Sequence, residues 1–495
     1  MLYLVYWRGE LVLQAEGPAS IPPSLSFLRV ARCDRVIVKT RAFATLRSLR
    51  RVELVNIGQL DVQEAGLVWE PHRHSNHTAQ NIGGGPPNQY EEVYGGPNTL
   101  TSVTMILDSI SKCPQLSRFT FGGHLDLISI TNTNIDKIDS YAFTNLRGKI
   151  DKIEFRNTNI NHIDALAFRR IYIETMSFVH CNIKKIQSRS MYETRIKRDF
   201  IFDDVTVGEI ASLGVALTGP MKTIIKSCQF EHISGEAFRI ATRGIVVING
   251  NIFEIMDSGA LAGIKPMSPE EIVQESFLYN PEEHDSPHTV PSIEDGGKPP
   301  RPKRPDFKFV SELLLQNNTL KQFSDGALYI NKGYDVTYSK LVLSHTMCEC
   351  TGSVTLITNL VGIPQSPYDE FASTPHHDTS QLYRTTWCLT KSKYKTLPEF
   401  REEHCSTINK GSVVYVSIGV AVLVLIVIVL AALVFIYWWR RKKGLEQKLT
   451  IVVPEARTYR ETELQVIVEH AEPIPAQPET HRLVNAKYEQ QLQNT

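Results

Sequence analysis

Histidine and acidic side chains are the residues in this sequence that could bind a metal or transfer protons. Three histidines fall within residues 72–77, and two more stand at His376-His377. A zinc site needs three or four ligands held by supporting hydrogen bonds, whereas these histidines lie in Pro- and Gly-rich stretches without a neighbouring cysteine pair. The acidic pair Asp203-Asp204 follows a predicted strand, where a solvated turn is the simpler interpretation. With no nucleophile elbow, P-loop or HExxH motif present, the sequence predicts no enzyme, metal site or cofactor.

The overall composition excludes some partners. The 53 Lys and Arg residues balance 53 Asp and Glu residues among 495, so the net charge is zero. A nucleic-acid-binding domain normally carries a basic excess, and we expect no nucleic-acid partner. With 42% apolar and 21% charged residues the chain has enough apolar side chains to fold.

Cysteines and glycosylation sequons share one part of the chain. All eight cysteines precede residue 413 and none follows it. Disulfides form in oxidising, extracellular compartments. The sequons at Asn76 and Asn317 lie on the same side and are the predicted glycosylation sites. This distribution predicts that the chain before residue 413 is extracellular.

A single membrane-spanning helix is predicted at residues 413–439. These 27 residues carry no charge and end in Tyr-Trp-Trp, and Arg440-Arg-Lys-Lys443 follows at once. About 20 apolar residues span a bilayer as a helix, and basic residues mark its cytoplasmic side. We therefore expect a type I plasma-membrane protein with a disordered cytoplasmic tail, 440–495, able to recruit an adaptor. The opening segment, 1–25, fits a signal peptide poorly, so we expect the signal peptide to be absent or the segment incomplete.

A repeat of 23–25 residues runs through the predicted outer domain. The phrase Ile135-Asp-Lys-Ile-Asp-Ser-Tyr-Ala-Phe143 returns at Ile160, with weaker copies later. The copies start at residues 135, 160, 183, 207, 230, 253 and 320. Apolar residues such as Ile153 and Phe155 stand seven and five positions before the starts, except that Thr223 takes the first of these places before the copy at 230. This alternation predicts a half-buried strand. Two positions before the starts stand Thr133, Thr158, Cys181, Val205, Cys228, Asn251 and Asn318.

Rougher turns of the same frame precede these copies. Leu28 to Cys33 leads to Ala42-Phe43, and Val52-Glu-Leu54 begins another turn. Phe119-Thr-Phe121 is interpreted as the start of one more.

The repeat resembles the leucine-rich repeat, LxxLxLxxNxLxxL, with its extracellular continuation AFxxL. Asn251 and Asn318 match the family's asparagine position. The resemblance covers residues 26–346, interrupted by loop-like insertions at 68–98 and 266–306. It implies an α/β solenoid, leucine-rich-repeat-like, whose stacked units bury a continuous core and whose parallel strands line a concave face.

The cysteines after the last repeat resemble the family's C-terminal cap. Cys348-Glu-Cys350 follows the strand Leu341-Val-Leu343, and Cys388 and Cys405 come before the membrane. Residues 347–410 would form this cap and a juxtamembrane stalk. Four cysteines allow three pairings, and the resemblance implies Cys348 with Cys388 and Cys350 with Cys405.

The other cysteines are assigned by spacing in the stack. Cys181 and Cys228 are two units apart, roughly 9–10 Å at the spacing of neighbouring strands. A disulfide needs Cα atoms closer than about 7 Å, so both are predicted to be buried free thiols. A weak link between Cys33 and Cys113 stays open.

The resemblance places the binding surface on the concave face. The outward residues that we expect to contact a partner there are Lys152, Glu154, Arg156, His180, Asp203, Lys222 and Lys226. Their mixed signs favour an extracellular protein ligand or cell-surface partner. We expect a non-catalytic adhesion molecule or receptor. Two alternatives stay open: a membrane-anchored parallel β-helix acting on polysaccharide, which should stack acidic residues in one row, and a structural surface or matrix-contact protein.

Overall fold

The computed structural model describes the chain except residues 17–20, 70–101, 147–149, 269, 273–310, 332, 363–378, 392 and 445–495. Two compact units divide it, Met1–Val413 and Val414–Thr495. The predicted glycosylation site Asn76 and nearly all of the predicted tail lie outside the described residues.

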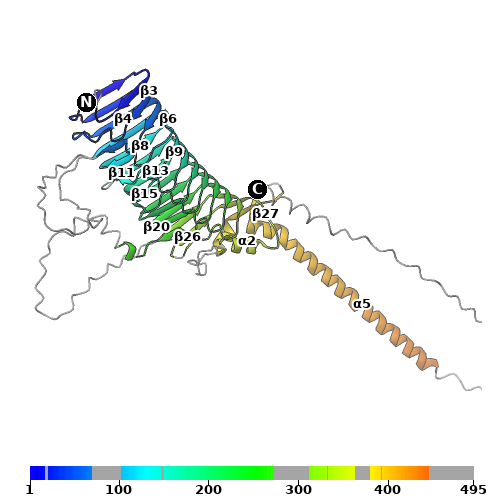
Figure 1. Ribbon diagram of the computed structural model, residues 1–495. Coiled ribbons are helices and arrows are strands. Elements are labelled where there is room, and N and C mark those ends of the chain that lie inside the picture. The colour runs from blue at the N-terminus through cyan, green and yellow to red at the C-terminus, as the bar shows by residue number, and fades with distance from the viewer. Residues whose placement is uncertain are drawn as a thin grey trace, which may run out of the picture. The chain divides into compact units, whose positions relative to one another are not determined.

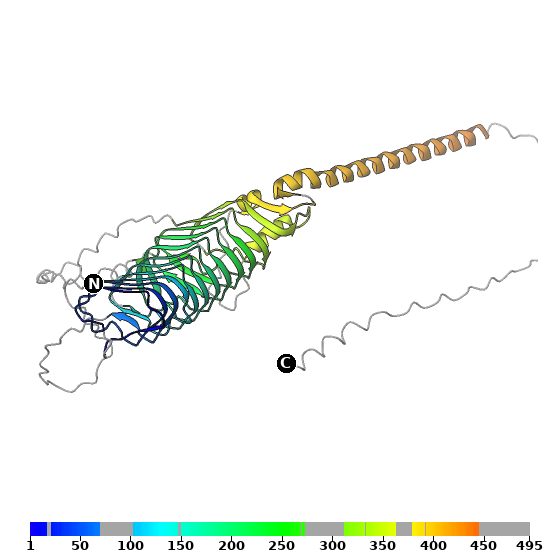
Figure 2. The ribbon, with the colours of Figure 1, turned by 90° about the horizontal axis from the view of Figure 1, so that it is seen from above.

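The first unit is a parallel-strand solenoid built on two long sheets (Figure 1). The main path of the first sheet is β1 (Leu2–Val5), β3 (Phe27–Val38), β4 (Arg51–Val62), β6 (Val103–Lys112), β8 (Leu125–Thr131), β11 (Ile150–Arg156), β13 (Tyr172–Val179), β15 (Thr194–Asp203), β18 (Lys222–Lys226), β21 (Ile245–Asn249), β24 (Glu312–Gln316) and β26 (Asp335–Ser339). The second sheet runs through β9 (Asn134–Ile138), β12 (Asn159–Ile163), β14 (Asn182–Ile186), β16 (Thr206–Ile210), β19 (Gln229–Ile233), β22 (Ile252–Met256), β25 (Thr319–Phe323), β27 (Leu341–Met347), β28 (Thr386–Leu389) and β29 (Tyr394–Thr396). Successive rungs therefore stack side by side in chain order (Figure 2).

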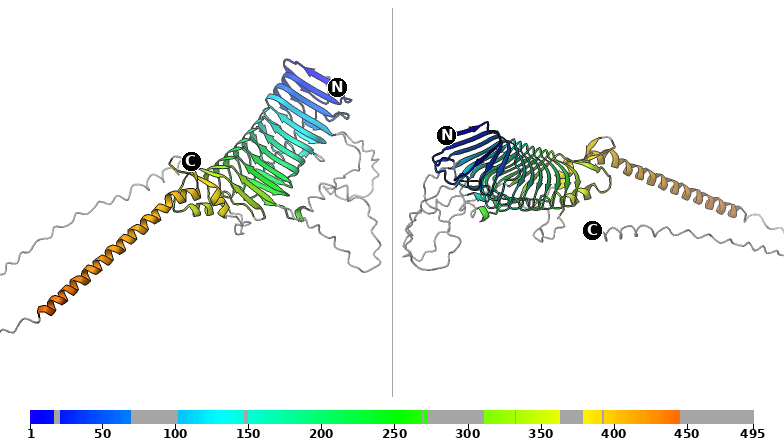
Figure 3. Two further views of the ribbon diagram at one scale, coloured as in Figure 1. Left: turned by 180° about the vertical axis from the view of Figure 1, so that it is seen from behind. Right: turned by 45° about the horizontal axis from the view of Figure 1, so that its top comes forward.

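Shorter strands extend some rungs. In the first sheet these are β2 (Glu10–Leu13), β17 (Val215–Thr218), β20 (Phe238–Thr242) and β23 (Lys265–Pro266). A separate three-stranded sheet contains β5 (Leu67–Trp69), β7 (Phe121–Gly123) and β10 (Asn145–Leu146). Two further views show the same stack of parallel strands (Figure 3).

Each rung turns from the first sheet into the second through one residue with positive φ. The corner residues are Asn132, Asn157, His180, Asp204, Ser227, Gly250 and Asn317. Most are Asn, Asp, His or Gly, the residue types most often found in the left-handed region. The corner is also bonded to the next rung, because Asn157 N–H donates to the Val179 carbonyl at 3.0 Å.

The core is filled by inward residues of both sheets and by the phenylalanines of the repeat's turn. Ile153 and Phe155, expected inside by their alternation, are fully buried. The rings stack from rung to rung: Phe143 lies 4.4 Å from Phe168, and Phe155 lies 4.8 Å from Phe178, centroid to centroid. Stacking makes the core continuous, so no single unit has to bury its apolar residues alone.

The predicted asparagine position is confirmed as a buried polar ladder. Asn318 Nδ2 donates to the Ile248 carbonyl at 2.8 Å, and its Oδ1 accepts the Asn251 backbone N–H at 3.0 Å. The threonine and cysteine substitutes donate with smaller groups, as Thr158 Oγ1 does to the Arg156 carbonyl at 3.0 Å, whereas Val205 has no polar side-chain group to donate. These bonds satisfy backbone groups that the corner would otherwise leave buried without partners.

The solenoid differs from the sequence prediction in two places. β1 and β2 pair in parallel with β3, so the stack begins ahead of residue 26, because the opening residues alternate as a strand. Phe119-Thr-Phe121 does not begin a first-sheet strand. The first-sheet strand of this rung is β6, and residues 121–123 form β7 in the separate three-stranded sheet. The helices with defined bounds lie after the last solenoid strand, Leu341–Met347, whereas turns and short strands join the described rungs.

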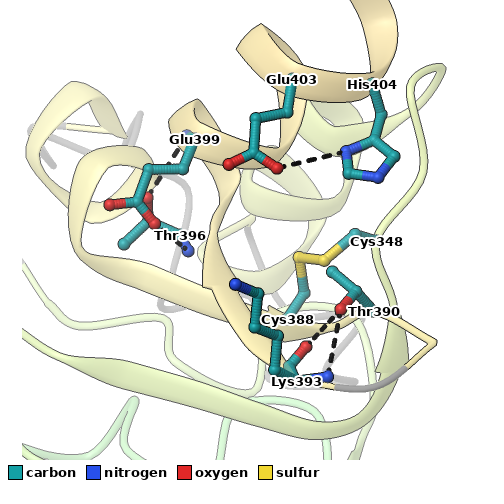
Figure 4. The surroundings of a disulfide bond; sticks show 8 residues. All are labelled: Cys348, Cys388, Thr390, Lys393, Thr396, Glu399, Glu403 and His404. Atoms are coloured by element: carbon teal, nitrogen blue, oxygen red, sulfur yellow. Dashed lines mark hydrogen bonds and ion pairs between the residues drawn. A yellow bond between two sulfur atoms is a disulfide. The ribbon is translucent and has the colours of Figure 1, made fainter.

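The cap covers the last rungs with α2 (Ser353–Leu360), α3 (Thr379–Thr385) and α4 (Leu397–Phe400). The Asn359 and Leu360 carbonyls accept the N–H groups of Gly326 and Leu328 at 2.7 and 2.9 Å. Disulfides join Cys348 to Cys388 and Cys350 to Cys405, the pairs that the resemblance implies. Thr396 and Glu399 form a capping box at the start of α4, beside the first disulfide (Figure 4).

The remaining cysteines are buried free thiols, as predicted for Cys181 and Cys228; Cys33 and Cys113 are likewise unlinked. Burial raises the pKa of Cys181 to about 11 and that of Cys228 to about 12. Because the thiolate is the reactive form, we expect N-ethylmaleimide to modify Cys181 roughly a hundredfold more slowly than an exposed cysteine, and Cys228 more slowly still. Mass spectrometry of the labelled full chain checks this. Rapid native labelling of Cys181 would contradict it, and complete labelling in concentrated guanidinium is the positive control.

The second unit contains most of helix α5 (Ser406–Gly444), whose residues Ser417–Lys442 are long and apolar enough to cross a membrane. This segment agrees with the span predicted at 413–439. Its large side chains are exposed within the unit, for example Leu425 at 64% and Phe435 at 69%. An apolar helix exposed in this way is suited to lipid rather than to water.

Candidate functional surface

The outward side of the first sheet, here called the open face, presents three rows of side chains along the stack. Residues in one row are register partners on neighbouring strands, except that Ile245 and Glu312 are placed in one row because each directly precedes the partners Val246 and Leu313. The entry row holds Lys152, Thr175, Asp199, Lys222, Ile245, Glu312 and Asp335. The middle row holds Glu154, Ser177, Ile201, Ile224, Val247, Leu314 and Thr337. The corner row holds Arg156, Val179, Asp203, Lys226, Asn249, Gln316 and Ser339.

On β11 the predicted contact residues form one ion-paired cluster. The Glu154 carboxylate accepts from Arg156 at 2.6 Å and lies 3.1 Å from Lys152 Nζ. Burial alone would raise the pKa of Glu154, but the hydrogen bonds from Arg156 and Lys152 outweigh it and hold the pKa below its usual range. The cluster's charges are therefore largely neutralised within the chain, which lowers the attraction that a charged partner would feel here.

The predicted residues farther along the stack fall into two groups. Lys226 pairs with Asp203 at 3.0 Å. His180 lies one residue beyond β13, at the corner rather than on the strand face, because it takes the left-handed conformation that turns the chain; it pairs with Asp204 at 2.7 Å. Lys222 is exposed and has no ion-pair partner in the described part of the chain.

The middle row contains an apolar stripe that the predicted contact residues omit. Ile201, Ile224, Val247 and Leu314 are partly exposed, on four neighbouring strands. The signal was available, because each stands six residues before a repeat start. The same row argues against stacked acids, because register places Glu154 between Ser129 and Ser177.

Asn317 occupies a suitable position for a glycan. It is exposed at the corner between β24 and β25, with φ of 52°. We expect the chain expressed through the secretory pathway to carry a glycan at Asn317, and Thr319→Ala to remove it. Thr206→Ala is the matched control. Thr206 begins β16 as Thr319 begins β25, but the residue two positions before it is not asparagine, so it belongs to no sequon. An unmodified Asn317 in glycopeptide mapping of the wild-type chain would contradict this prediction.

The clefts of the first unit are defined only by residues with described positions. One cleft, about 570 Å³, is lined near the N-terminal end by Arg35, Asp61 and Arg118 among others, and Arg35 already pairs with Asp61 at 2.7 Å. No group of three or more His, Cys, Asp or Glu residues suited to a metal occurs within the described residues. The predicted histidine clusters at 72–77 and 376–377 fall outside those residues.

The fold and this surface define a class, a leucine-rich-repeat-like parallel-strand solenoid with an open sheet face and a disulfide-linked cap. Among solved structures, the chain is similar to one titled "Crystal structure of LRIM1/APL1C complex", with 11% identity over 86% of this chain and 69% of that chain and a TM-score of 0.22. A likeness this slight carries no argument about function. No family model and no curated protein matches the chain.

Proposed function

We propose that this protein is a non-catalytic cell-surface binding protein, an adhesion molecule or receptor, which recognises a protein partner through the open face. The apolar helix would anchor it in the plasma membrane with the solenoid outside, and the tail would recruit a cytoplasmic adaptor. The observation that carries the proposal is the open face itself, an extended sheet surface with apolar residues in the middle row and charged residues on both sides. Protein interfaces commonly have an apolar centre and a polar rim.

The orientation is supported by the chemistry of the two sides. Two disulfides lie in the first unit, and four basic residues, Arg440 to Lys443, follow the apolar segment. Disulfides favour an oxidising exterior and basic residues the cytoplasmic side. Epitope tags at both ends, probed on intact and permeabilised cells, test the orientation.

A binding screen tests the proposed function. Cells displaying the full chain are probed with soluble cell-surface ectodomains and a set of glycans. We expect saturable binding of a protein, weakened by Arg156→Glu or Lys226→Glu on the open face. Lys184→Glu is the matched control, because Lys184 is equally an exposed lysine but lies on the second sheet.

The rival classes are distinguished by the same experiment. Binding or cleavage of a glycan would replace the proposal with a polysaccharide-acting protein. Absence of binding to both libraries would favour the structural or matrix-contact role. Deleting the residues after Lys443 then distinguishes a receptor from an adhesion molecule. An adhesion molecule that needs no adaptor keeps its cell-attachment activity without these residues.

A further inference from the structure

The apolar stripe, Ile201, Ile224, Val247 and Leu314, is flanked by charged residues for which the described part of the chain supplies no ion-pair partner. Lys222, Glu312 and Asp335 in the entry row are all exposed, and none has an ion-pair partner in the described residues. Glu312 and Asp335 are register neighbours on β24 and β26. Like charges on adjacent strands are destabilising, and no cation among the described residues pairs with either carboxylate to offset the repulsion.

Among the described residues, the unpaired lysine of the same row lies two strands away from the acidic pair. Lys222 lies on β18 and Glu312 on β24, with β21 between them. Two strand spacings separate them by roughly 9–10 Å, which is too long for an ion pair within one rigid sheet. The middle of this arrangement is Ile245 and Val247 on β21, both apolar.

We propose that the apolar stripe is the interface with a second copy of this chain, related by a two-fold axis that runs along β21. Such an axis reverses the order of strands, so β18 of one copy faces β24 of the other. Lys222 then faces Glu312 of the second copy, twice by symmetry, and Ile224 faces Leu314. A two-fold interface uses the same patch on both copies, and this patch is complementary to itself in charge and in apolar character.

The opposite arrangement is disfavoured by the same charges. A two-fold axis along the stack would place the entry row against the corner row. Lys222 would then face Lys226, and Asp199 would face Asp203. In the proposed arrangement one like pair remains, Asp199 facing Asp335, and Arg198 lies 3.8 Å from Asp199 to offset it. Facing sheets pack about 10 Å apart, within reach of these side chains.

Cysteine cross-linking of the full chain on cells tests the geometry. Val247→Cys lies on the axis and faces its own equivalent across about 10 Å. This distance is too long for a direct disulfide but within reach of a short bismaleimide cross-linker, so we expect a cross-linked dimer on denaturing gels. Gln322→Cys, exposed on the second sheet, is the matched control and should stay monomeric. Ile201→Cys alone should give little dimer, because four strand spacings, roughly 19 Å, separate the two copies. Mixed with a Thr337→Cys chain it should cross-link, because Ile201 faces Thr337.

Charge exchange tests the specificity. Lys222→Glu and Glu312→Lys should each abolish dimerisation of the full chain in detergent, measured by sedimentation. Combining both changes in one chain should restore the dimer, because a glutamate then faces a lysine at both contacts. Mixing the two single variants should restore it for the same reason. Surface expression of each variant shows that it has folded.

Specific outcomes would overturn the proposal. These are a wild-type monomer, Val247→Cys dimers no more abundant than those of Gln322→Cys, or a dimer that persists in both single charge variants. The last result would place the dimer contact elsewhere, for example on helix α5. The inference rests on the proposed function in one respect, because it names a second copy of the chain as a partner of the same open face. The two fail separately: the ectodomain screen measures binding of a foreign protein, including at Arg156 on β11 outside the apolar stripe, whereas sedimentation and cross-linking measure self-association.

Discussion

Replacing Phe155 by alanine is expected to lower the free energy of unfolding of the first unit by about 3–5 kcal/mol. The ring is fully buried, stacks on Phe178 at 4.8 Å and meets Phe168 edge to face at 6.2 Å. Parallel ladders hold β11 between β8 and β13 on both sides. The neighbouring rungs cannot easily move inward to fill the cavity, so the cost should lie toward the upper end of the range.

Hydrogen exchange of the full chain in detergent is the appropriate measurement. Stacked repeats need not unfold in one step, and exchange reports the stability of each rung separately. We expect faster exchange in β8, β11 and β13 and little change in the cap. Phe119→Ala is the matched control, because Phe119 is only partly buried at a turn. Equal losses in the two variants would contradict the account of the core.

The repeat period made much of the solenoid predictable from sequence. A 23–25-residue spacing with apolar residues seven and five positions before each start fixes which side chains point inward, and Ile153, Phe155, Phe200 and Phe202 are all fully buried. Even the departure at Thr223 keeps its inward place, with no exposed surface. The frame is strong because a shift of one residue would turn every strand side chain to the opposite face.

The parts that escaped prediction are those where the period is broken. β6 follows residues 70–101, which interrupt the repeat, so the 23–25-residue spacing cannot be continued from the previous copy to β6. The sequence prediction therefore leaves out its buried pair, Met105 and Leu107. The predicted solenoid, which begins at residue 26, leaves out β1 and β2, because the first 13 residues match no copy of the repeat. Their alternation, with Leu4 partly buried against the core, is a strand pattern.

The candidate surface was predicted only in part, since sequence gives facing but not pairing. The outward direction of Glu154 follows from alternation, whereas its ion pairs with Lys152 and Arg156 depend on side-chain positions. The predicted contact residues are all charged residues or histidine, so they do not include the apolar stripe. An isoleucine at an outward strand position is unremarkable alone, and its meaning depends on neighbours such as Val247 and Leu314, which are 67 residues apart.

Removing the disulfide between Cys350 and Cys405 is expected to destabilise the cap by about 4 kcal/mol. This is the loop-closure cost for a separation of 55 residues, which the disulfide removes from the unfolded cap. The double variant Cys350→Ser/Cys405→Ser avoids leaving a reactive thiol. Without the disulfide, α2 is held to the last turn by few backbone bonds, including those to Gly326 and Leu328.

The effect of the disulfide should be confined to one end of the stack. We expect faster hydrogen exchange in β28, α2 and α4 and at Gly326 and Leu328, with β11 unchanged, because each rung contacts only its neighbours. Cys33→Ala is the matched control: it alters a buried free cysteine at the other end of the solenoid and should leave exchange in the cap unaltered. Unchanged exchange in the cap of the double variant would mean that apolar packing of residues such as Ile357 and Leu360 holds it in place without the covalent link. Equal acceleration in β11 would instead show that the cap and the solenoid unfold as one cooperative unit, against the nearest-neighbour stability expected of stacked rungs.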